Sequence, residues 1–316
     1  MLFTPLTLRC GLVLPNRIAL APMTNLQSQP DGLLGEDELV WLARRADGGF
    51  GLVQTCAAYV ALDGKAWPGE QTWSASTWTE ERTDFHVPRV GTTDDISRTI
   101  RAFADAAARA EKAGFDGVEL HGAHGYLLSQ FLSRTMNPRT DGWGTDIAGR
   151  ARLVRECVRA CRAATSSRFA IGVRLSFEDF AQAKGMDLDD NLRVAAWLVD
   201  DGADFIHASL WDVTRMSAKY PDKHVLTLLR AELPADIAIL TAGKIWTRED
   251  ADATIARGAD VIALGRSGIV NPDWPKDVAA GRAIKTPPVT RAELLERAVS
   301  PTFATYLRMW KNFLVD

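Results

Sequence analysis

Short apolar runs alternate with amphipathic helical stretches along most of this 316-residue chain, and this alternation limits its fold more than any other feature. The runs are almost continuously apolar, which is typical of parallel strands buried on both faces. The predicted strands are 18–23, 51–58, 117–120, 169–175, 204–210, 236–242 and 260–264, and the predicted helices include 93–113, 149–164, 189–201 and 247–257. Repeated strand–helix units indicate a parallel α/β sheet, either open or closed into a barrel.

Polar and special residues follow the ends of these strands and favour the barrel. Thr24 follows the first strand, His121 the third and Gly243 the sixth. Such residues converge on one face of a (β/α) barrel, whereas a dinucleotide-binding sheet calls for a Gly-x-Gly-x-x-Gly turn, which no early strand carries. We therefore predict an α/β fold of the TIM (β/α)8 type, with residues 1–316 as a single domain. Residues 6–17 predict an N-terminal hairpin that closes the amino-terminal end of the barrel.

The strand count exposes a departure from the regular barrel. Seven strands are evident where eight are expected, and the wide gap between the second and third contains no clear apolar strand. We predict that the third strand of the barrel is missing or distorted and that residues 59–93 form an irregular loop over the barrel mouth. Either neighbouring strands close the gap, or residues 71–78 fill it as an irregular strand.

Charge and composition exclude several classes of protein. The net charge is −3, from 37 Lys and Arg against 40 Asp and Glu, and no basic face for nucleic acid is evident. No apolar run reaches membrane-spanning length, and the first residues do not resemble a signal peptide. We expect a cytoplasmic protein without a membrane or nucleic-acid partner. Cys157 and Cys161 have the spacing of half a metal site, but two small apolar residues on a packed helix are favoured, and no metal is expected.

The third predicted strand leads directly into a cluster of residues with catalytic chemistry. His121 and His124 are three residues apart, and Tyr126 follows them. Two imidazoles and a phenol at the carboxyl end of a strand can bind an oxyanion and transfer a proton, which predicts an enzyme. The competing interpretation of an isolated His-x-x-His is a structural pair.

Further motifs lie along the chain in a fixed order. They are Pro15-Asn16-Arg17 with Ala21-Pro22-Met23-Thr24, the stretch Ala113–Gly144, Gly172–Ser176, Thr241–Lys244, and Ala263–Arg266 followed by Asn271–Pro275. Together they span nearly the whole chain and resemble the old yellow enzyme family of FMN-dependent NAD(P)H ene-reductases. The resemblance implies FMN as cofactor, NADPH or NADH as hydride donor, and an enone-type small molecule whose C=C bond is reduced. It also implies a possible homo-oligomer, as in relatives.

The resemblance assigns roles to individual residues. His121 and His124 would bind the carbonyl oxygen of the substrate, and Tyr126 would protonate its α-carbon. Thr24 would contact the flavin near C4=O, with a hydroxyl bonded to the backbone as the competing interpretation. Arg174 would lie beside the flavin N1–C2=O edge. The full set implied to bind FMN is Pro22, Met23, Thr24, Ala57, Arg174, Ala242, Gly243, Gly265 and Arg266, of which Gly243, Gly265 and Arg266 would hold the phosphate.

The chain departs from the family pattern between its second and third predicted strands. The family carries a further strand there, with a glutamine that contacts the flavin, and its absence predicts an internal deletion of about one βα unit, on the order of 30 residues. Two alternatives therefore stay open. One is a non-catalytic barrel with impaired flavin binding. The other is a phosphate-binding lyase or isomerase, for which only Lys244 and Glu119 lie near strand ends.

Overall fold

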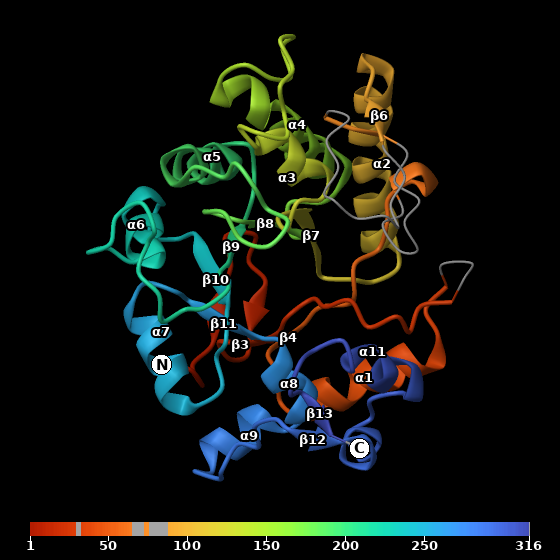
Figure 1. Cartoon of the computed structure of the whole chain (residues 1–316), viewed down its shortest axis with the longest axis vertical. Coiled ribbons are helices and arrows are strands. Elements are labelled where there is room, and N and C mark those ends of the chain that lie inside the picture. The colour runs from red at the N-terminus through yellow and green to blue at the C-terminus, as the bar shows by residue number, and fades with distance from the viewer. Residues whose placement is uncertain (30–32, 65–72, 76–87, 316) are drawn as a thin grey trace.

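A parallel sheet of seven strands forms the centre of the molecule (Figure 1). The computed structural model describes residues 1–29, 33–64, 73–75 and 88–315. The strands follow the order β4-β3-β11-β10-β9-β8-β7 across the sheet. They are β3 (Ile18–Leu20), β4 (Leu52–Val53), β7 (Gly117–Gly122), β8 (Ala170–Leu175), β9 (Phe205–Ser209), β10 (Ala238–Ala242) and β11 (Val261–Leu264). Each of the seven predicted strands is confirmed, mostly with shorter bounds.

Helices follow most of these strands, as expected for repeated strand–helix units. Figure 1 shows α2, α4 and α5 beyond one end of the sheet and α1, α9 and α11 beyond the other. The four predicted helices correspond to α2, α4, α5 and α7. The helical elements are α1 (Glu36–Asp47), η1 (Leu62–Gly64), α2 (Thr93–Lys112), α3 (Leu127–Leu132), α4 (Ile147–Ala164), α5 (Leu188–Asp200), α6 (Val225–Glu232), α7 (Arg248–Ala256), α8 (Arg266–Val270), α9 (Trp274–Ala279), α10 (Arg291–Glu296) and α11 (Pro301–Leu307).

The sheet curls into an incomplete barrel whose edges are β4 and β7. In the described parts of the chain, neither edge pairs with an eighth strand. The strands β5 (Trp73–Ser74) and β6 (Arg89–Val90) pair in parallel with one another, so the described part of 71–78 does not join the barrel sheet. Residues 65–72 and 76–87 of the expected mouth loop lie outside the described residues. The barrel class is confirmed in a distorted form, while the internal deletion and the single domain stay predictions.

The N-terminal hairpin closes one end of the barrel, as predicted. The strands β1 (Leu6–Thr7) and β2 (Val13–Leu14) pair antiparallel. Leu8 and Leu14 are buried in one apolar cluster with inward side chains of the sheet such as Ala19 and Leu240. Burial of a leucine contributes about 1.5–3 kcal/mol, so this packing fixes the hairpin under the sheet. The end of the barrel that the hairpin leaves uncovered is therefore the one formed by the carboxyl ends of the strands.

The Pro15-Asn16-Arg17 motif joins two strands of the sheet. Asn16 Oδ1 accepts the N–H groups of Ile18 and Gly51 at 3.0 and 3.1 Å, and Asn16 Nδ2 donates to the carbonyl of Gly49 at 2.8 Å. A Cβ on Gly51 would lie 2.6 Å from Asn16 Oδ1, so only glycine fits this approach. The motif therefore sets the start of β3 against the start of β4.

The aromatic C-terminus packs on the chain's own core. The rings of Trp41 on α1 and Phe303 on α11 meet edge to face with centroids 5.1 Å apart, and Tyr306 and Trp310 border the same cluster. The strands β12 (Val289–Thr290) and β13 (Leu314–Val315) pair beneath it. An intramolecular role thus accounts for this segment, and a homo-oligomer stays a prediction.

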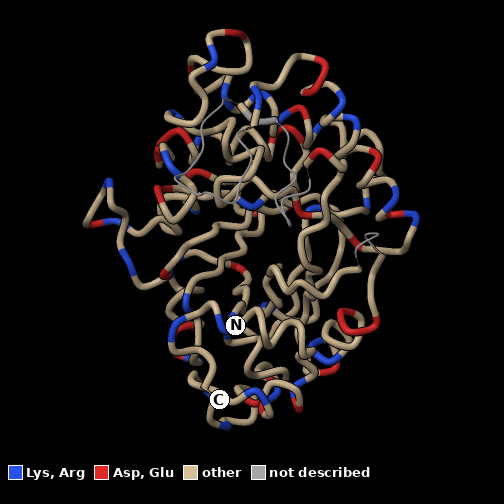
Figure 2. Tube along the Cα trace, turned by 45° about the vertical axis from the view of Figure 1, so that its right-hand side comes forward, with Lys and Arg blue, Asp and Glu red and all other residues tan. Residues whose placement is uncertain are grey.

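Charged residues of both signs are distributed over the traced chain. Figure 2 shows both signs of charge interspersed along the outer loops of the traced chain. Within the described residues, no helix combines the length and apolarity needed to cross a membrane. Cys157 and Cys161 are buried on the core face of α4, as favoured from the sequence.

Candidate active site

The register of three neighbouring strands gathers polar side chains inside the carboxyl half of the barrel. His121 of β7 pairs with Arg174 of β8, and Arg174 pairs with His207 of β9. Alternate residues of a strand face the same side, so Glu119 lies one layer below His121, and Ser209 lies one layer above His207. The interior is therefore apolar next to the hairpin and polar next to the mouth.

The predicted catalytic residues lie side by side at the end of β7. The ring centroids of His121 and His124 are 4.9 Å apart, and those of His121 and Tyr126 are 5.2 Å apart. His124 adopts the left-handed region with φ +59, and its N–H donates to Ser176 Oγ at 3.1 Å. Its Nε2 lies 2.6 Å from Ser209 Oγ. The strand ends of β8 and β9 thus hold the second imidazole beside the first.

Both imidazoles are neutral at ordinary pH. Burial, followed by the positive charge of Arg174, lowers the pKa of His121 to about 3 and that of His124 to about 2. A neutral imidazole carries one N–H and can donate one hydrogen bond. When Ser209 Oγ donates to Nε2 of His124, the N–H of that ring is on Nδ1, and each imidazole can donate to an oxygen atom placed between the two rings and Tyr126.

Arg174 is a buried cation with unused hydrogen-bonding capacity. Its Nη1 donates to the carbonyl of Pro22 at 3.3 Å, and its Nε has no hydrogen-bond partner among the residues that the structure describes. A guanidinium has five N–H donors in a rigid fork. The donor set fits a planar acceptor edge such as the N1–C2=O edge of a flavin, next to the backbone of Pro22.

The predicted phosphate-binding residues lie at the ends of β10 and β11. Gly243 has φ +156, and a Cβ on it would lie 2.5 Å from the carbonyl oxygen of Leu210, so the position requires glycine. Arg266 is half-buried at the start of α8, and burial lowers its pKa. No hydrogen bond or ion pair to it occurs in the described ranges, so its charge is available to an anion.

The remaining predicted cofactor residues line the strand ends next to these. A Cβ on Gly265 would lie 3.5 Å from Met23 Sδ, which brings the ends of β3 and β11 together. Thr24 is half-buried, and its hydroxyl has no hydrogen bond within the described chain, so the competing backbone-bonded role is not observed. Ala57 is exposed beyond β4, and Ala242 is buried as the last residue of β10.

A known protein family matches most of the chain. The model of the NADH:flavin oxidoreductase / NADH oxidase family matches residues 1–88 and 77–285.

The chain belongs to this family.

A probable NADH-dependent flavin oxidoreductase, YqiG of Bacillus subtilis, is 31% identical over 89% of this chain and 88% of its own length. An NADPH dehydrogenase of Bacillus pumilus is 30% identical over 88% of this chain and 94% of its own. An NADH:acrylate oxidoreductase of Vibrio harveyi is 29% identical over 84% of this chain and 32% of its own.

Solved structures show the same fold. Morphinone reductase in complex with tetrahydroNAD superposes with a TM-score of 0.78 at 23% identity, covering 100% of this chain and 98% of that one. The old yellow enzyme homologue from Zymomonas mobilis gives a TM-score of 0.79 at 23% identity, covering 96% and 98%. The flavin oxidoreductase described here is thus an NAD(P)H-dependent enzyme that uses FMN.

Several residues of the site were not predicted from the sequence. Ser176 and Ser209 hold His124, and Glu119 bonds to His207 and Gln54. The sequence did offer one indication of Ser209. It follows His207 by two residues in a buried strand, so both side chains are expected on the same face of the sheet. Nothing in the local sequence links residues as distant as Glu119 and His207.

The lysine and the carboxylate that suggested a lyase or isomerase have other partners. Lys244 Nζ lies 2.9 Å from Asp212 Oδ2, and both residues belong to loops beyond the strands. Glu119 Oε2 lies 2.8 Å from His207 Nδ1 inside the barrel. Lys244 and Glu119 are therefore engaged separately with other partners, which disfavours the lysine or carboxylate pair that this alternative requires.

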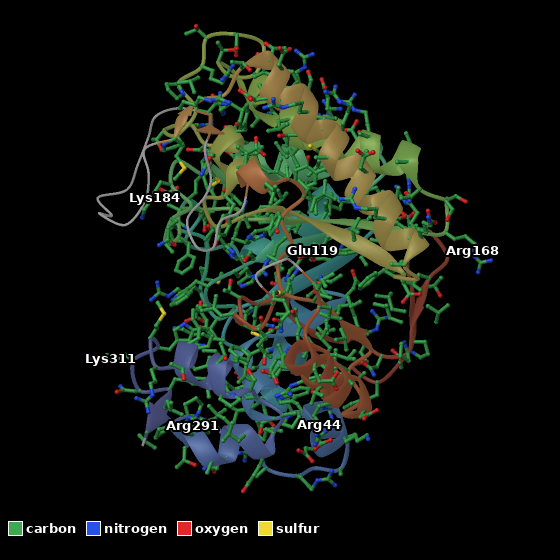
Figure 3. The ribbon with its side chains drawn as sticks, turned by 90° about the vertical axis from the view of Figure 1, so that its right-hand side faces the viewer. Arg44, Glu119, Arg168, Lys184, Arg291 and Lys311 are labelled. Atoms are coloured by element: carbon green, nitrogen blue, oxygen red, sulfur yellow. The ribbon has the colours of Figure 1, made fainter. Side chains whose placement is uncertain are left out.

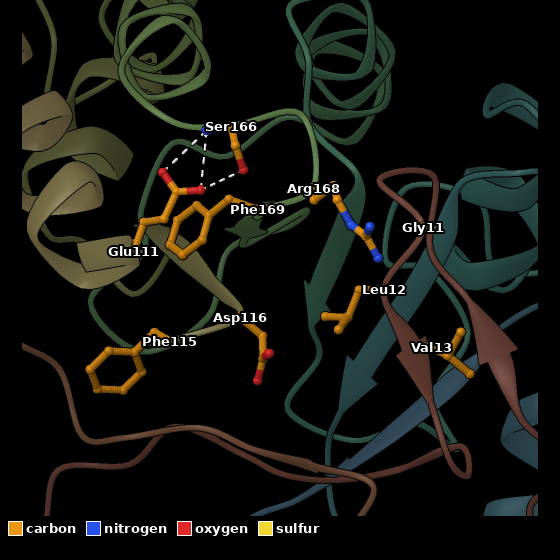
Figure 4. A pocket seen from close by; sticks show the side chains of 9 residues that line it. All are labelled: Gly11, Leu12, Val13, Glu111, Phe115, Asp116, Ser166, Arg168 and Phe169. Carbon is orange, nitrogen blue, oxygen red and sulfur yellow. Dashed lines mark hydrogen bonds between the residues drawn. The ribbon is translucent and has the colours of Figure 1, made fainter. Parts of the chain in front are cut away.

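A hollow lies at the opposite end of the barrel (Figure 4). It encloses about 390 Å³ between the tip of the hairpin at Leu12 and the residues that precede β7 and β8, such as Asp116 and Arg168. Asp116 precedes the first residue of β7, whereas His121 lies near its end. This hollow is therefore separate from the candidate active site.

The buried histidines make stability depend on pH. Burial lowers the pKa of His121, His124, His207 and His224 in the folded protein. The unfolded chain, with histidines near pKa 6.5, takes up protons first as the pH falls. The free energy of unfolding is therefore expected to fall below about pH 6.5, by up to about 1.4 kcal/mol per histidine for each pH unit.

Urea unfolding of the apoprotein between about pH 8 and about pH 5 measures this dependence, since most carboxylates stay ionised over that range. His224→Asn is the matched control. His224 Nδ1 accepts the N–H of Leu226 at the start of α6, and asparagine keeps that cap while it removes one titrating group. Equal free energies of unfolding at the two ends of the range would contradict the neutral state of these histidines.

Proposed function

We propose that this flavin oxidoreductase reduces the C=C bond of α,β-unsaturated carbonyl compounds with hydride from NADH or NADPH. The observation that carries the proposal is the pair of neutral imidazoles 4.9 Å apart, with Tyr126 beside His121, at the open end of the barrel. The relative named NADH:acrylate oxidoreductase supports an activated alkene as acceptor. The separate engagement of Lys244 and Glu119 argues against the lyase or isomerase alternative.

Residues at five strand ends would hold FMN. Arg174, next to the backbone of Pro22 and Met23, would contact the N1–C2=O edge, and the free hydroxyl of Thr24 would approach the C4=O side. Arg266, with the backbone of Gly243 and Gly265, would hold the phosphate. Ala57 and Ala242 are small enough for the ring to lie against the backbone. When bound, FMN supplies the hydride that reaches the β-carbon of the alkene.

His121 and His124 would act on the carbonyl oxygen. That oxygen gains negative charge as the β-carbon accepts hydride, and two N–H donors placed in advance lower the energy of this state. The contacts of His124 with Ser176 and Ser209 fix one donor, so little reorganisation is needed. Because neither imidazole is charged, the pair polarises the carbonyl without giving up a proton to it.

Tyr126 would complete the reaction by donating its phenolic proton to the α-carbon. General acid catalysis of this kind contributes about 10²–10⁴-fold. Tyr126→Phe is therefore expected to lower the rate of enone reduction by a factor in this range, while the yellow FMN complex forms normally. Steady-state consumption of NADPH with cyclohexenone measures it. Tyr220→Phe removes a phenol that bonds to Asp189 away from the site and serves as the control. Full activity in Tyr126→Phe would exclude this role.

The proposed function is tested by loading the purified protein with FMN and following NADPH oxidation without oxygen. We expect stoichiometric uptake of FMN and oxidation that depends on cyclohexenone, with none for the saturated ketone cyclohexanone. Failure to bind FMN would support the non-catalytic barrel. Binding of FMN and reduction by NADPH, without any reaction of the enone, would show that the acceptor belongs to another class.

A further inference from the structure

A buried carboxylate lies one layer below the predicted flavin-contacting arginine, on the neighbouring strand. Glu119 precedes His121 by two residues on the inner face of β7, and its side chain is 9% exposed. Its Oε2 accepts the Nδ1–H of His207 at 2.8 Å and the Nε2–H of Gln54 at 3.0 Å. Figure 3 labels Glu119 among the strands in the interior, far from surface residues such as Arg168. Neither the proposed hydride transfer nor the proton transfer uses this group.

Glu119 is ionised and His207 is neutral. Burial raises the pKa of Glu119, but the hydrogen bonds from His207 and Gln54 and the charge of Arg174 outweigh that effect and lower the pKa below its ordinary value. Burial lowers the pKa of His207, which is completely buried. The arrangement therefore places one negative charge on Glu119 one layer below the positive charge of Arg174.

The side chain of His207 makes one hydrogen bond in the described chain, to Glu119. Its Nδ1 is bound to Glu119, while its Nε2 is buried without a partner in the described chain. An unsatisfied buried polar atom costs about 1–3 kcal/mol. An apolar residue at position 207 would avoid that cost. His207 therefore lowers the stability of the fold while it holds the carboxylate of Glu119 in place.

We propose that Glu119, held by His207 and Gln54, is a positioning residue that lowers the reduction potential of FMN through Arg174. The inference rests on the proposed function only in that FMN lies against Arg174. Reduced FMN gains negative charge next to the guanidinium, which attracts that charge. In a barrel interior of low dielectric, the fixed carboxylate offsets part of this attraction and repels the added charge. The charge of Glu119 also favours the ionised form of Arg174, because it raises the pKa of that buried guanidinium against the effect of burial.

Glu119→Gln tests the charge with little change in shape. The amide keeps the volume of the side chain and an oxygen that accepts from His207 or Gln54. We expect the oxidised–reduced equilibrium of bound FMN to shift about tenfold toward the reduced form, a rise of about 30 mV for a two-electron couple. Anaerobic spectroelectrochemistry of the FMN-loaded enzyme measures this potential, with neither NADPH nor enone present.

Leu240→Ala is the matched control. Leu240 is the neighbour of His207 in register on β10 and is fully buried, so the change disturbs the same layer without altering charge. It is expected to lower the free energy of unfolding by about 2–5 kcal/mol and to leave the potential unchanged. A shift of the potential in Leu240→Ala equal to that in Glu119→Gln would show that packing, and not charge, is responsible.

Substitutions of His207 provide a second route if Glu119→Gln does not fold. His207→Leu removes the Nδ1–H donor and favours the protonated carboxyl, so the potential is expected to rise. His207→Asn keeps an N–H donor at the same place and is expected to restore the potential of the natural enzyme.

An unchanged potential in Glu119→Gln, or in His207→Leu, overturns the inference even if the enzyme reduces enones. A shifted potential in an enzyme that does not reduce enones supports the inference and refutes the proposed function. Absence of FMN binding by the natural chain overturns both.

Discussion

Replacing His121 by leucine is expected to slow the reaction of the reduced enzyme with cyclohexenone about 10²–10³-fold, and His124→Leu is expected to do the same. Each change removes one of two donors that meet the charge developing on the carbonyl oxygen, and a single donor of this kind contributes about that factor. The rings are 4.9 Å apart, which is close enough for both to donate to one oxygen, and the double variant is expected to be slower than either single variant. Anaerobic rapid mixing, which follows the return of the flavin colour, measures the rate.

His124→Asn is the matched control for this prediction. Asparagine keeps an N–H donor, and it tolerates the left-handed backbone of position 124, where φ is +59. It is therefore expected to retain much more activity than His124→Leu. If the double leucine variant reacted with cyclohexenone at the natural rate, the two histidines would have no part in binding the carbonyl.

Replacing Arg174 by leucine is expected to lower the free energy of unfolding of the apoprotein by about 3–5 kcal/mol and to weaken FMN binding. Arg174 and Glu119 attract one another through the barrel interior without direct contact. The change removes this attraction from the buried carboxylate, and an uncompensated buried charge has a cost of this order. Urea unfolding without FMN measures stability, and titration with FMN measures affinity.

The double variant Glu119→Gln with Arg174→Leu separates the two effects. Removing both charges is expected to restore much of the stability, because a buried pair can often be replaced as a whole at little cost. The FMN affinity is expected to stay low, since no cation remains beside the ring. If Arg174→Leu alone were as stable as the double variant, Glu119 and Arg174 would not be coupled.

The sequence predicts most of the sheet for a simple physical reason. Strands such as β8 and β9 are buried on both faces, so their apolar runs are long and unbroken and lie close to their observed bounds. The strand β4 has only two residues in the sheet, and the expected strand 51–58 was too long. Beyond Val53 the chain is half-buried as far as Cys56 and exposed from Ala57 at the edge of the barrel, where composition does not set the end of a strand.

The predicted site follows from sequence only where neighbouring residues carry the chemistry. His121, His124 and Tyr126 lie in one turn, so their proximity is a local property. The bond between Glu119 and His207 is different, because it spans 88 positions and depends on how β7 and β9 each pair with β8. The support of His124 by Ser209 depends on the same register. These contacts become evident only once the sheet is assembled.

The most direct test of this account follows both halves of the reaction in the absence of oxygen. The FMN-loaded enzyme is first bleached with one equivalent of NADPH, or of NADH in a parallel sample, and then mixed with cyclohexenone. We predict that the enone restores the yellow colour and that one equivalent of cyclohexanone forms per flavin. A bleached enzyme that stays bleached in excess cyclohexenone, and turns yellow only when oxygen is admitted, would contradict it.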